Sequence, residues 1–341
     1  MSKLTIALDI MGGDHGPPVT LPAAIKAIQQ HAEFHFILCG KESAIAPYLQ
    51  SLTTQQRERV TLEHCEQVVE MGESPTSALR TKKSSSMRRV IELVNEGVAD
   101  ACVSAGNTGA LLTLAFYILK TLPGIDRPAL ISMMPTADHH KVFLLDLGAN
   151  VNCTSETLFQ YGVMGSVLAE QISGIENPRV ALLNVGEEDI KGNAQVKHAD
   201  QLFKQAAELN YIGYVEGDDI FTDNADVVVT DGFTGNVALK SSEGLAKLVI
   251  SELRQQSQAN LFTRMMAKIA LPLLKSIYNR VNPDQYNGAS LIGLRGIVVK
   301  SHGNASSDAF YYAIVEAMQE ARIGVPEKIK NKIETVLLEQ L

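Results

Sequence analysis

The sequence of 341 residues lacks the marks of a membrane-spanning, disulfide-bonded or nucleic-acid-binding protein. It contains no run of about 18 apolar residues, which excludes a membrane-spanning helix. Its four cysteines stand far apart and form neither a CxxC pair nor a zinc-binding spacing, so we expect reduced thiols in a cytoplasmic protein. The net charge of -8 excludes the broad basic surface of a general nucleic-acid binder.

Several common catalytic signatures are also missing. The sequence has no G-x-S-x-G nucleophile elbow, and its glycines form neither a G-x-G-x-x-G fingerprint nor a P-loop. No His is followed by Asp five positions later, so the H-x4-D signature of membrane glycerol-phosphate acyltransferases is absent too. The function must therefore be inferred from other motifs.

Short apolar runs recur along the chain and alternate with segments of helical spacing such as NTGALLTLAFYILK. The runs are LTIALDI, FHFILCG, ADACVSAG, ALISMM, KVFLLDLG, RVALLNVG, ADVVVTDG and GIVVKSHG. Such continuous runs are typical of strands that are buried on both faces. The alternation predicts a three-layer, Rossmann-like α/β fold with a mostly parallel sheet and helices on both faces. With no repeat and no Pro-rich linker, we expect one catalytic unit over residues 1–341.

Five of the expected strands end in turns rich in glycine and small polar residues. The turns are residues 8–17 (LDIMGGDHGP), 104–110 (SAGNTGA), 184–193 (NVGEEDIKGN), 231–236 (DGFTGN) and 301–306 (SHGNAS). Ligands of such sheets bind at the carboxyl ends of the strands, where glycine permits close approach and helix N-termini attract anions. The turns therefore predict an anion site, most simply for phosphate. The alternative is that the glycines only make turns, while Asn107 and Thr234 only cap helices.

Taken together, the motifs resemble those of the bacterial phosphate acyltransferase family, PlsX. The matching segments are IALDIMGGDHGP, SAGNTGA, LLNVGEE, DGFTGN and NGASLIGLRGIVVKSHG, in this order from residue 5 onward. The fold of that family is similar to those of phosphotransacetylases and isocitrate-type dehydrogenases. The resemblance implies transfer of a fatty acyl group from acyl carrier protein to inorganic phosphate. The acyl phosphate would feed a membrane glycerol-phosphate acyltransferase in phospholipid synthesis.

The chemistry that the resemblance implies needs no metal, no cofactor and no protein nucleophile, because phosphate itself attacks. It needs an anion cradle and a cation. The candidate substrate-binding residues are Asp9, Gly12, Gly13, Asp14, Ser104, Gly106, Asn107, Thr108, Asp231, Gly232, Thr234, Gly235, His302 and Gly303. The candidate catalytic residues are His15, Asn236 and Lys191, the last being the expected cation. The alternative for Lys191 is an ion pair with Glu187 or Glu188 at the surface.

A basic cluster predicts where the carrier protein docks. From Ser74 to Ile91 the chain has no acidic residue, and its basic residues are Arg80, Lys82, Lys83, Arg88 and Arg89. Acyl carrier proteins are strongly acidic, so a net-acidic enzyme needs such a local basic surface. The alternatives are a solvated helix face and a phosphate site at Lys82 and Lys83.

Residues 259–281 combine an apolar stripe with four basic residues and no acidic one. The stripe consists of Phe262, Met265, Met266, Ile269, Leu273 and Ile277. Pro272 predicts two helices that meet at a bend, so we expect residues 255–285 to form a protruding amphipathic hairpin. The composition favours peripheral association with an anionic membrane surface. The alternative is a subunit interface, as in a homodimer, or a core helix pair, and one hairpin can serve both membrane and interface.

Two other functions are compatible with these features. One is a metal- and NAD-dependent hydroxyacid dehydrogenase of similar fold, which would need clustered Asp ligands and an adenosine site. The other is a non-catalytic, membrane-associated scaffold for lipid enzymes, which would form no acyl phosphate.

Overall fold

The computed structural model describes residues 3–138 and 140–339. Its strands are β1 (Leu4–Asp9), β2 (Phe34–Gly40), β3 (Val60–His64), β4 (Ala101–Ser104), β5 (Ala129–Pro135), β6 (Lys141–Leu145), β7 (Arg179–Leu183), β8 (Asn210–Val215), β9 (Val227–Val229), β10 (Ala289–Ile292) and β11 (Ile297–Lys300). Its α-helices are α1 (Pro17–Gln30), α2 (Glu42–Leu49), α3 (Thr54–Arg57), α4 (Pro75–Thr81), α5 (Ser86–Asn95), α6 (Thr108–Leu119), α7 (Ser155–Ser173), α8 (Ala194–Gln205), α9 (Gly232–Gln258), α10 (Leu261–Ile269), α11 (Leu271–Val281), α12 (Ser307–Ile323) and α13 (Val325–Glu339). Two 3-10 helices, η1 (Asp219–Phe221) and η2 (Pro283–Tyr286), complete the described elements.

One sheet runs through the molecule with its strands in the order β3-β2-β1-β4-β11-β10-β5-β6-β9-β7-β8. The strands from β3 to β11 are parallel to one another. The short β10 is antiparallel to both of its neighbours, and β6 is antiparallel to β5. From β6 to β8 the strands are again parallel. The predicted mostly parallel α/β fold is therefore confirmed.

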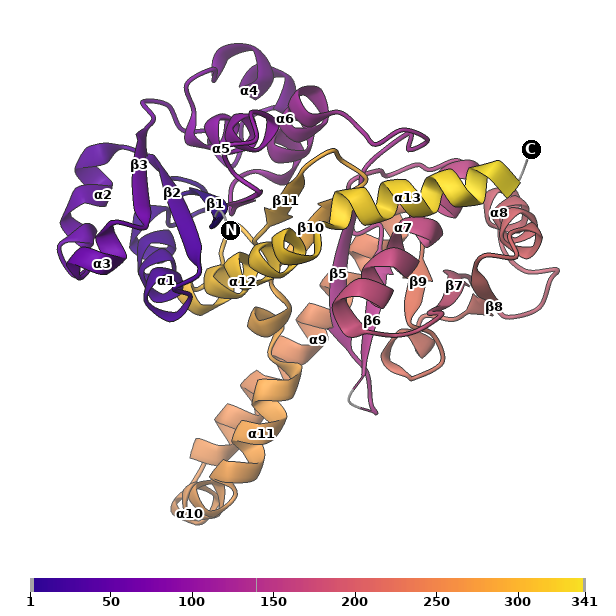
Figure 1. The fold of residues 1–341 in the computed structure, drawn as a ribbon. Helices are drawn as coiled ribbons and strands as arrows, with labels where there is room; N and C mark the ends of the chain where they lie inside the picture. The colour runs from indigo at the N-terminus through magenta and orange to yellow at the C-terminus, as the bar shows by residue number, and fades with distance from the viewer. Residues whose placement is uncertain (1–2, 139, 340–341) are drawn as a thin grey trace.

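Helices cover both faces of this sheet (Figure 1). Along β1 successive side chains point to opposite faces. Ile6 and Leu8 pack with α1 and α12, whereas Ala7 packs with α5 and α6. Burial on both faces explains why the strand reads as a continuous apolar run.

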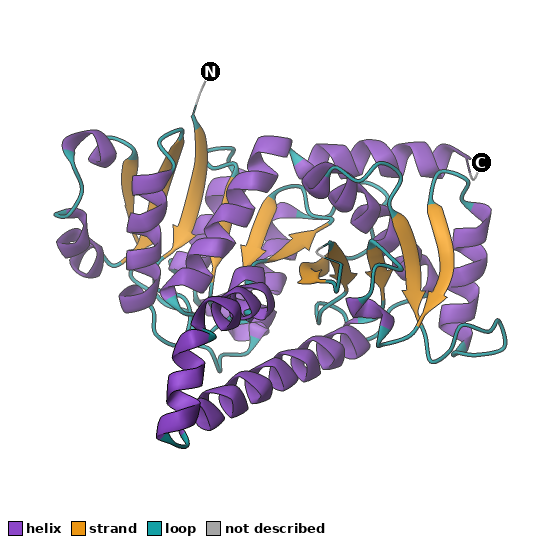
Figure 2. Cartoon of the chain, turned by 90° about the horizontal axis from the view of Figure 1, so that it is seen from below, coloured by secondary structure: helices purple, strands orange, loops and turns teal. Residues whose placement is uncertain are grey.

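A helical hairpin projects from the body of the molecule and contains the segment 255–285 (Figure 1). Its first arm is α9, which is 27 residues long. Asn260 begins α10 by accepting a hydrogen bond from the Thr263 main-chain nitrogen, at 2.9 Å. Pro272 is the second residue of α11, where the missing N–H breaks no helical hydrogen bond. Figure 2 shows that the two arms diverge from the tip toward the sheet. Within the described chain, no helix has the length and hydropathy needed to span a bilayer.

Candidate active site

The turns that follow β1, β4 and β11 meet at one edge of the sheet. The Ser104 hydroxyl donates to the Asp9 carboxylate at 2.6 Å, which joins the end of β4 to the end of β1. The main-chain nitrogen of Ser301 donates to the Ser104 carbonyl at 2.9 Å, and that of Asp14 donates to the Gly303 carbonyl at 2.8 Å. The structure thus brings together seven of the predicted substrate-binding positions, namely Asp9, Gly12, Gly13, Asp14, Ser104, Gly106 and Gly303.

Glycine is required in the first turn because the turns are packed main chain against main chain. A Cβ atom on Gly12 would lie 2.6 Å from the Asp9 carboxylate and 2.9 Å from the Gly106 nitrogen. Gly13 has a φ of +92°, and its Cβ would lie 3.0 Å from the Gly303 carbonyl oxygen. Burial raises the pKa of Asp9, although the hydrogen bond from Ser104 opposes the shift. The glycines of LDIMGGDHGP therefore allow the turns to pack closely.

A large cavity lies beside this edge, between the sheet and the helical hairpin. Its volume is about 1380 Å³, and much of its wall is apolar. Met133 and Met134 of β5 line one side, and Leu239, Val249 and Leu253 of α9 line the other. Ligand pockets commonly have volumes of about 300–1,000 Å³. The cavity therefore has room for a long apolar group.

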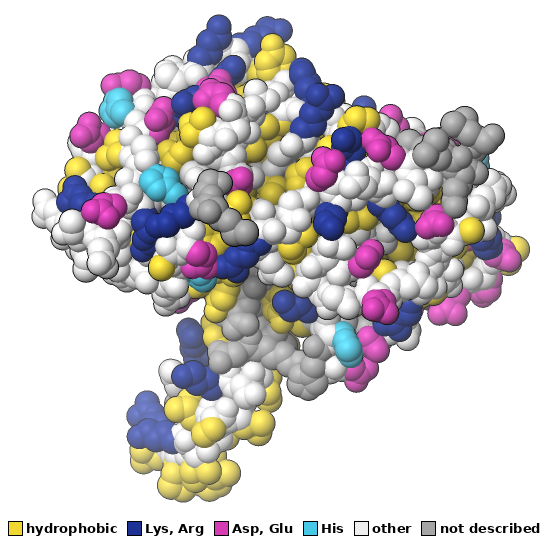
Figure 3. Space-filling model, in the orientation of Figure 1, with side chains coloured by type: hydrophobic (Ala, Val, Ile, Leu, Met, Phe, Trp, Pro, Cys, Tyr) yellow, Lys and Arg dark blue, Asp and Glu magenta, His cyan; other side chains and the backbone are white. Residues whose placement is uncertain are grey.

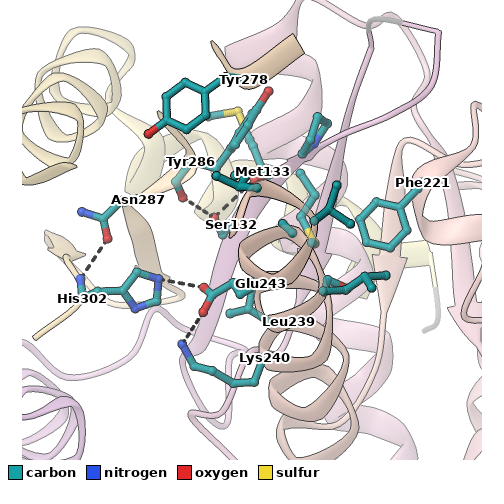
Figure 4. A pocket seen from close by; sticks show the side chains of 18 of the residues that line it. Ser132, Met133, Phe221, Leu239, Lys240, Glu243, Tyr278, Tyr286, Asn287 and His302 are labelled. Atoms are coloured by element: carbon teal, nitrogen blue, oxygen red, sulfur yellow. Dashed lines mark hydrogen bonds and ion pairs between the residues drawn. The ribbon is translucent and has the colours of Figure 1, made fainter. Parts of the chain in front are cut away.

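The end of the cavity nearest to β11 is polar (Figure 4). Glu243 of α9 accepts from the Lys240 amine at 2.9 Å, and its other oxygen lies 3.1 Å from Nε2 of His302. The main-chain nitrogen of His302 donates to the Asn287 side chain at 2.9 Å. Burial opposes ionisation of Glu243, but hydrogen bonds from His302 and Lys240 outweigh it and lower its pKa to about 2. An ionised carboxylate thus holds the His302 ring and the Lys240 amine in place.

A buried lysine also lines this polar end. Lys300 is the last residue of β11, is only 6% exposed, and donates from its amine to the Ser301 carbonyl. Burial, together with the nearby Lys240, lowers the pKa of Lys300 to about 8. Asp14 and Asp9 act in the opposite direction. In the described part of the chain, no carboxylate lies within 4.0 Å of the amine.

Of the other predicted site residues, some line the cavity and some cap or pack helices. Thr108, Asn236 and His302 line the cavity. Asn107 is the N-cap of α6, and Asp231 rather than Thr234 is the N-cap of α9. Cβ atoms on Gly232 and Gly235 would collide with the carbonyls of Asn150 and Asp146. These last two glycines allow α9 to pack closely against the loop that follows β6.

Lys191 and His15 do not line the cavity. Lys191 is exposed in the loop after β7, three strands beyond β5 in the sheet order. Its main-chain nitrogen donates to the Glu188 main-chain carbonyl at 2.9 Å. His15 is exposed in the turn after β1. Sequence reasoning missed Lys240, Glu243 and Lys300. A signal was present, since Asn236, Lys240 and Glu243 follow a spacing of four and three residues, which places them on one face of α9.

The basic cluster is partly neutralised inside the molecule. Arg88 pairs with Glu92 at 2.7 Å. Arg89 pairs with Glu63 at 2.7 Å and with Glu96 at 2.9 Å. Lys82 lies 3.5 Å from Glu73. Arg80 and Lys83 are exposed.

Comparison with known proteins identifies the class and then the family. Residues 4–328 match the fatty acid synthesis protein family. A phosphate acyltransferase of Pseudoalteromonas atlantica is 59% identical over 340 residues, covering 100% of both chains. A phosphate acyltransferase of Shewanella putrefaciens is 53% identical over 339 residues, covering 99% of both. Among solved structures, a phosphotransacetylase from Streptococcus pyogenes shares the fold, with a TM-score of 0.64 and 17% identity over 94% of each chain.

The sequence relatives show that the protein is an acyltransferase by class. The chain belongs to the fatty acid synthesis protein family, PlsX.

The packing of the turns predicts the effect of adding one methyl group. Gly12→Ala should lower the free energy of unfolding by about 1–3 kcal/mol, because the new Cβ collides with a buried carboxylate and with main chain. Gly72→Ala is the matched control, since its Cβ would meet no atom within 4 Å. Urea unfolding measures both variants. Equal free energies of unfolding for the two variants would show that the turn after β1 can shift to accommodate the added Cβ at little cost.

Proposed function

We propose that this protein transfers a fatty acyl group from acyl carrier protein to inorganic phosphate, giving acyl phosphate and free carrier protein. The observation that carries the proposal is that one cavity joins a long apolar wall to a polar end with two lysines and a histidine. An acyl chain suits the wall, and an anion suits the polar end. Membership of the family and the names of its relatives support acyl transfer to phosphate.

The reaction needs positioned groups and a proton path. An oxygen of hydrogen phosphate attacks the thioester carbonyl, the new C–O bond forms, and the C–S bond breaks. The proton of hydrogen phosphate ends on the departing thiol, so atoms and charge balance. Histidine is the side chain that most often transfers protons in enzymes. His302 lines the cavity and pairs with Glu243, so we assign this proton transfer to it. The cavity draws on residues from Thr108 to His302, which supports the proposal of a single catalytic unit.

An assay with purified protein tests the function. The protein is mixed with acyl carrier protein bearing a long acyl chain and with inorganic phosphate, and acyl phosphate is trapped with hydroxylamine. Hydroxylamine also cleaves thioesters, so a reaction without the protein gives the background to subtract. Above that background, we expect acyl phosphate and free carrier thiol to form in equal amounts, and no product when sulfate replaces phosphate. Turnover of a hydroxyacid with a nicotinamide cofactor instead would favour a dehydrogenase, and the absence of any product would favour a scaffold.

The acidic carrier protein should dock near α4, where two basic residues form no ion pair with any described part of the chain. Arg88 and Arg89 form ion pairs with carboxylates of α5, its C-cap and β3. Their positive charge is therefore partly neutralised and attracts an acidic partner less strongly. Arg80 and Lys83 are exposed at the end of α4. We therefore assign the first encounter with the carrier to Arg80 and Lys83.

Charge reversal tests the docking surface. The double variant Arg80→Glu, Lys83→Glu should raise the apparent KM for acyl carrier protein about ten-fold and reduce its salt dependence. Use of a short acyl thioester without the carrier should hardly change. The control Arg57→Glu places one reversal at an exposed position of α3, outside the basic cluster. An equal loss of activity with both acyl donors would mean that Arg80 and Lys83 stabilise the fold or bind phosphate, and do not dock the carrier.

The hairpin is the proposed contact with the cytoplasmic face of the membrane. Phe262 is 67% exposed, Ile269 is 69% exposed and Leu273 is 63% exposed. Figure 3 shows hydrophobic side chains gathered at the tip of the hairpin, with basic side chains beside them. Ile277 is 47% exposed and also lines the cavity, so it is less specific to the proposed membrane contact. Peripheral binding here would release acyl phosphate close to the membrane glycerol-phosphate acyltransferase that consumes it.

Flotation with vesicles tests this contact. The wild type should float with vesicles rich in anionic lipid, and high salt should weaken binding, since each basic residue near the surface contributes roughly 1 kcal/mol. The variant Ile269→Glu, Leu273→Glu should stay with the soluble fraction and keep its activity on dispersed substrate, because neither side chain lines the cavity. Flotation of the variant would refute the membrane contact. Dissociation of a dimer, measured by sedimentation, would instead assign the stripe to an interface between two copies of the chain.

A further inference from the structure

Lys300 is a buried cation with no carboxylate within 4.0 Å among the residues that the structure describes. It is only 6% exposed at the end of β11, and its amine donates to the main-chain carbonyl of Ser301. Among the described residues, the ion pairs of the polar end belong to Glu243, which serves Lys240 and His302. A buried ammonium group that is not neutralised is costly. An anion that entered the cavity would remove this cost.

The charged groups around Lys300 come from three elements. Lys240 faces it from α9 and disfavours its charged form. Asp14 in the turn after β1 and Asp9 at the end of β1 favour the charged form. Glu243 lies at the same end of the cavity and pairs with both Lys240 and His302. The largest effects on the Lys300 amine, burial and a second cation, both disfavour its charge, and a bound anion would oppose them.

We propose that Lys300 and Lys240 together hold inorganic phosphate at the polar end of the cavity, and that Lys300 gains a proton as the anion binds. The two amines come from a strand end and a helix face on either side of the same space. The proposal rests on the proposed function only for the identity of the anion. It adds Lys300 as a phosphate-holding cation, and the role of the exposed Lys191 stays a separate prediction.

Protonation gives this site a pH dependence with a definite sign. Burial lowers the pKa of Lys300 to about 8, so above that pH the free protein holds the amine largely neutral. A bound anion favours the charged form and raises this pKa. Binding at about pH 8.5 is therefore coupled to proton uptake, and the affinity falls as pH rises further. Near neutral pH the amine is already mostly protonated, so phosphate binding there is coupled to little proton uptake by Lys300.

Calorimetric titration of the full-length protein with inorganic phosphate tests the proposal. Titrations at about pH 8.5 in two buffers of different ionisation enthalpy give the number of protons taken up. We expect proton uptake on binding for the wild type and none for Lys300→Arg, whose guanidinium stays charged. Lys300→Met should bind phosphate roughly ten- to a hundred-fold more weakly, as expected for loss of one charge-assisted contact. Lys247→Met is the control, because Lys247 is an exposed lysine of α9 that does not line the cavity.

The outcomes separate this proposal from its rivals. Unchanged affinity and unchanged proton uptake in Lys300→Met would overturn it, and so would a loss of binding in Lys191→Met alone. Lys300→Met replaces a buried charge with an apolar chain of similar length, so it should fold, and thermal unfolding checks this. Phosphate binding is measured without an acyl donor. A protein that binds phosphate through Lys300 but forms no acyl phosphate would contradict the proposed function and leave this site intact.

Discussion

The polar end of the cavity depends on close contact between the main chains of neighbouring strand-end turns. The turn after β1 touches the turns after β4 and β11 at distances that leave no room for a Cβ on Gly12. The hydrogen bond from Ser301 to the Ser104 carbonyl extends the pairing of β4 with β11 by one residue. That extension fixes Lys300 and His302, which stand on either side of Ser301. Glycine here acts first through packing, and the functional side chains are placed as a consequence.

Sequence patterns predict the interior of the sheet well and its margins less well. Eight strands correspond to apolar runs, because a strand covered on both faces needs apolar side chains at every position. The strands without such a run are β3, β8 and β10. β3 and β8 are the edges of the sheet and carry more exposed side chains, and β10 has only four residues. Each of the three pairs with a strand next to it in the chain, but its own residues show too little apolar pattern to predict a strand.

The same distinction explains which site residues could be predicted. Thr108 and His302 sit in strand-end turns whose composition is informative by itself. Glu243 and Lys240 reach the site only because α9 crosses from the loop after β6 to the end of β11, a path set by tertiary packing. The basic cluster illustrates the converse. The stretch from Ser74 to Ile91 contains no acid, yet Glu63 and Glu96, from outside it, neutralise Arg89.

The proposed anion site lies in a molecule whose net charge is -8, so it depends on where positive charge is left without a carboxylate partner. Arg88 and Arg89 pair with carboxylates of the chain, which limits their attraction for a binding partner. Lys300 is buried and, among the described residues, has no carboxylate within 4.0 Å, so a counter-ion that entered the cavity would stabilise its charged form. A small dianion bound beside it would gain an attraction that water does not screen. In the proposed site, selectivity for a small anion would therefore come from desolvation, and it is compatible with an acidic surface elsewhere.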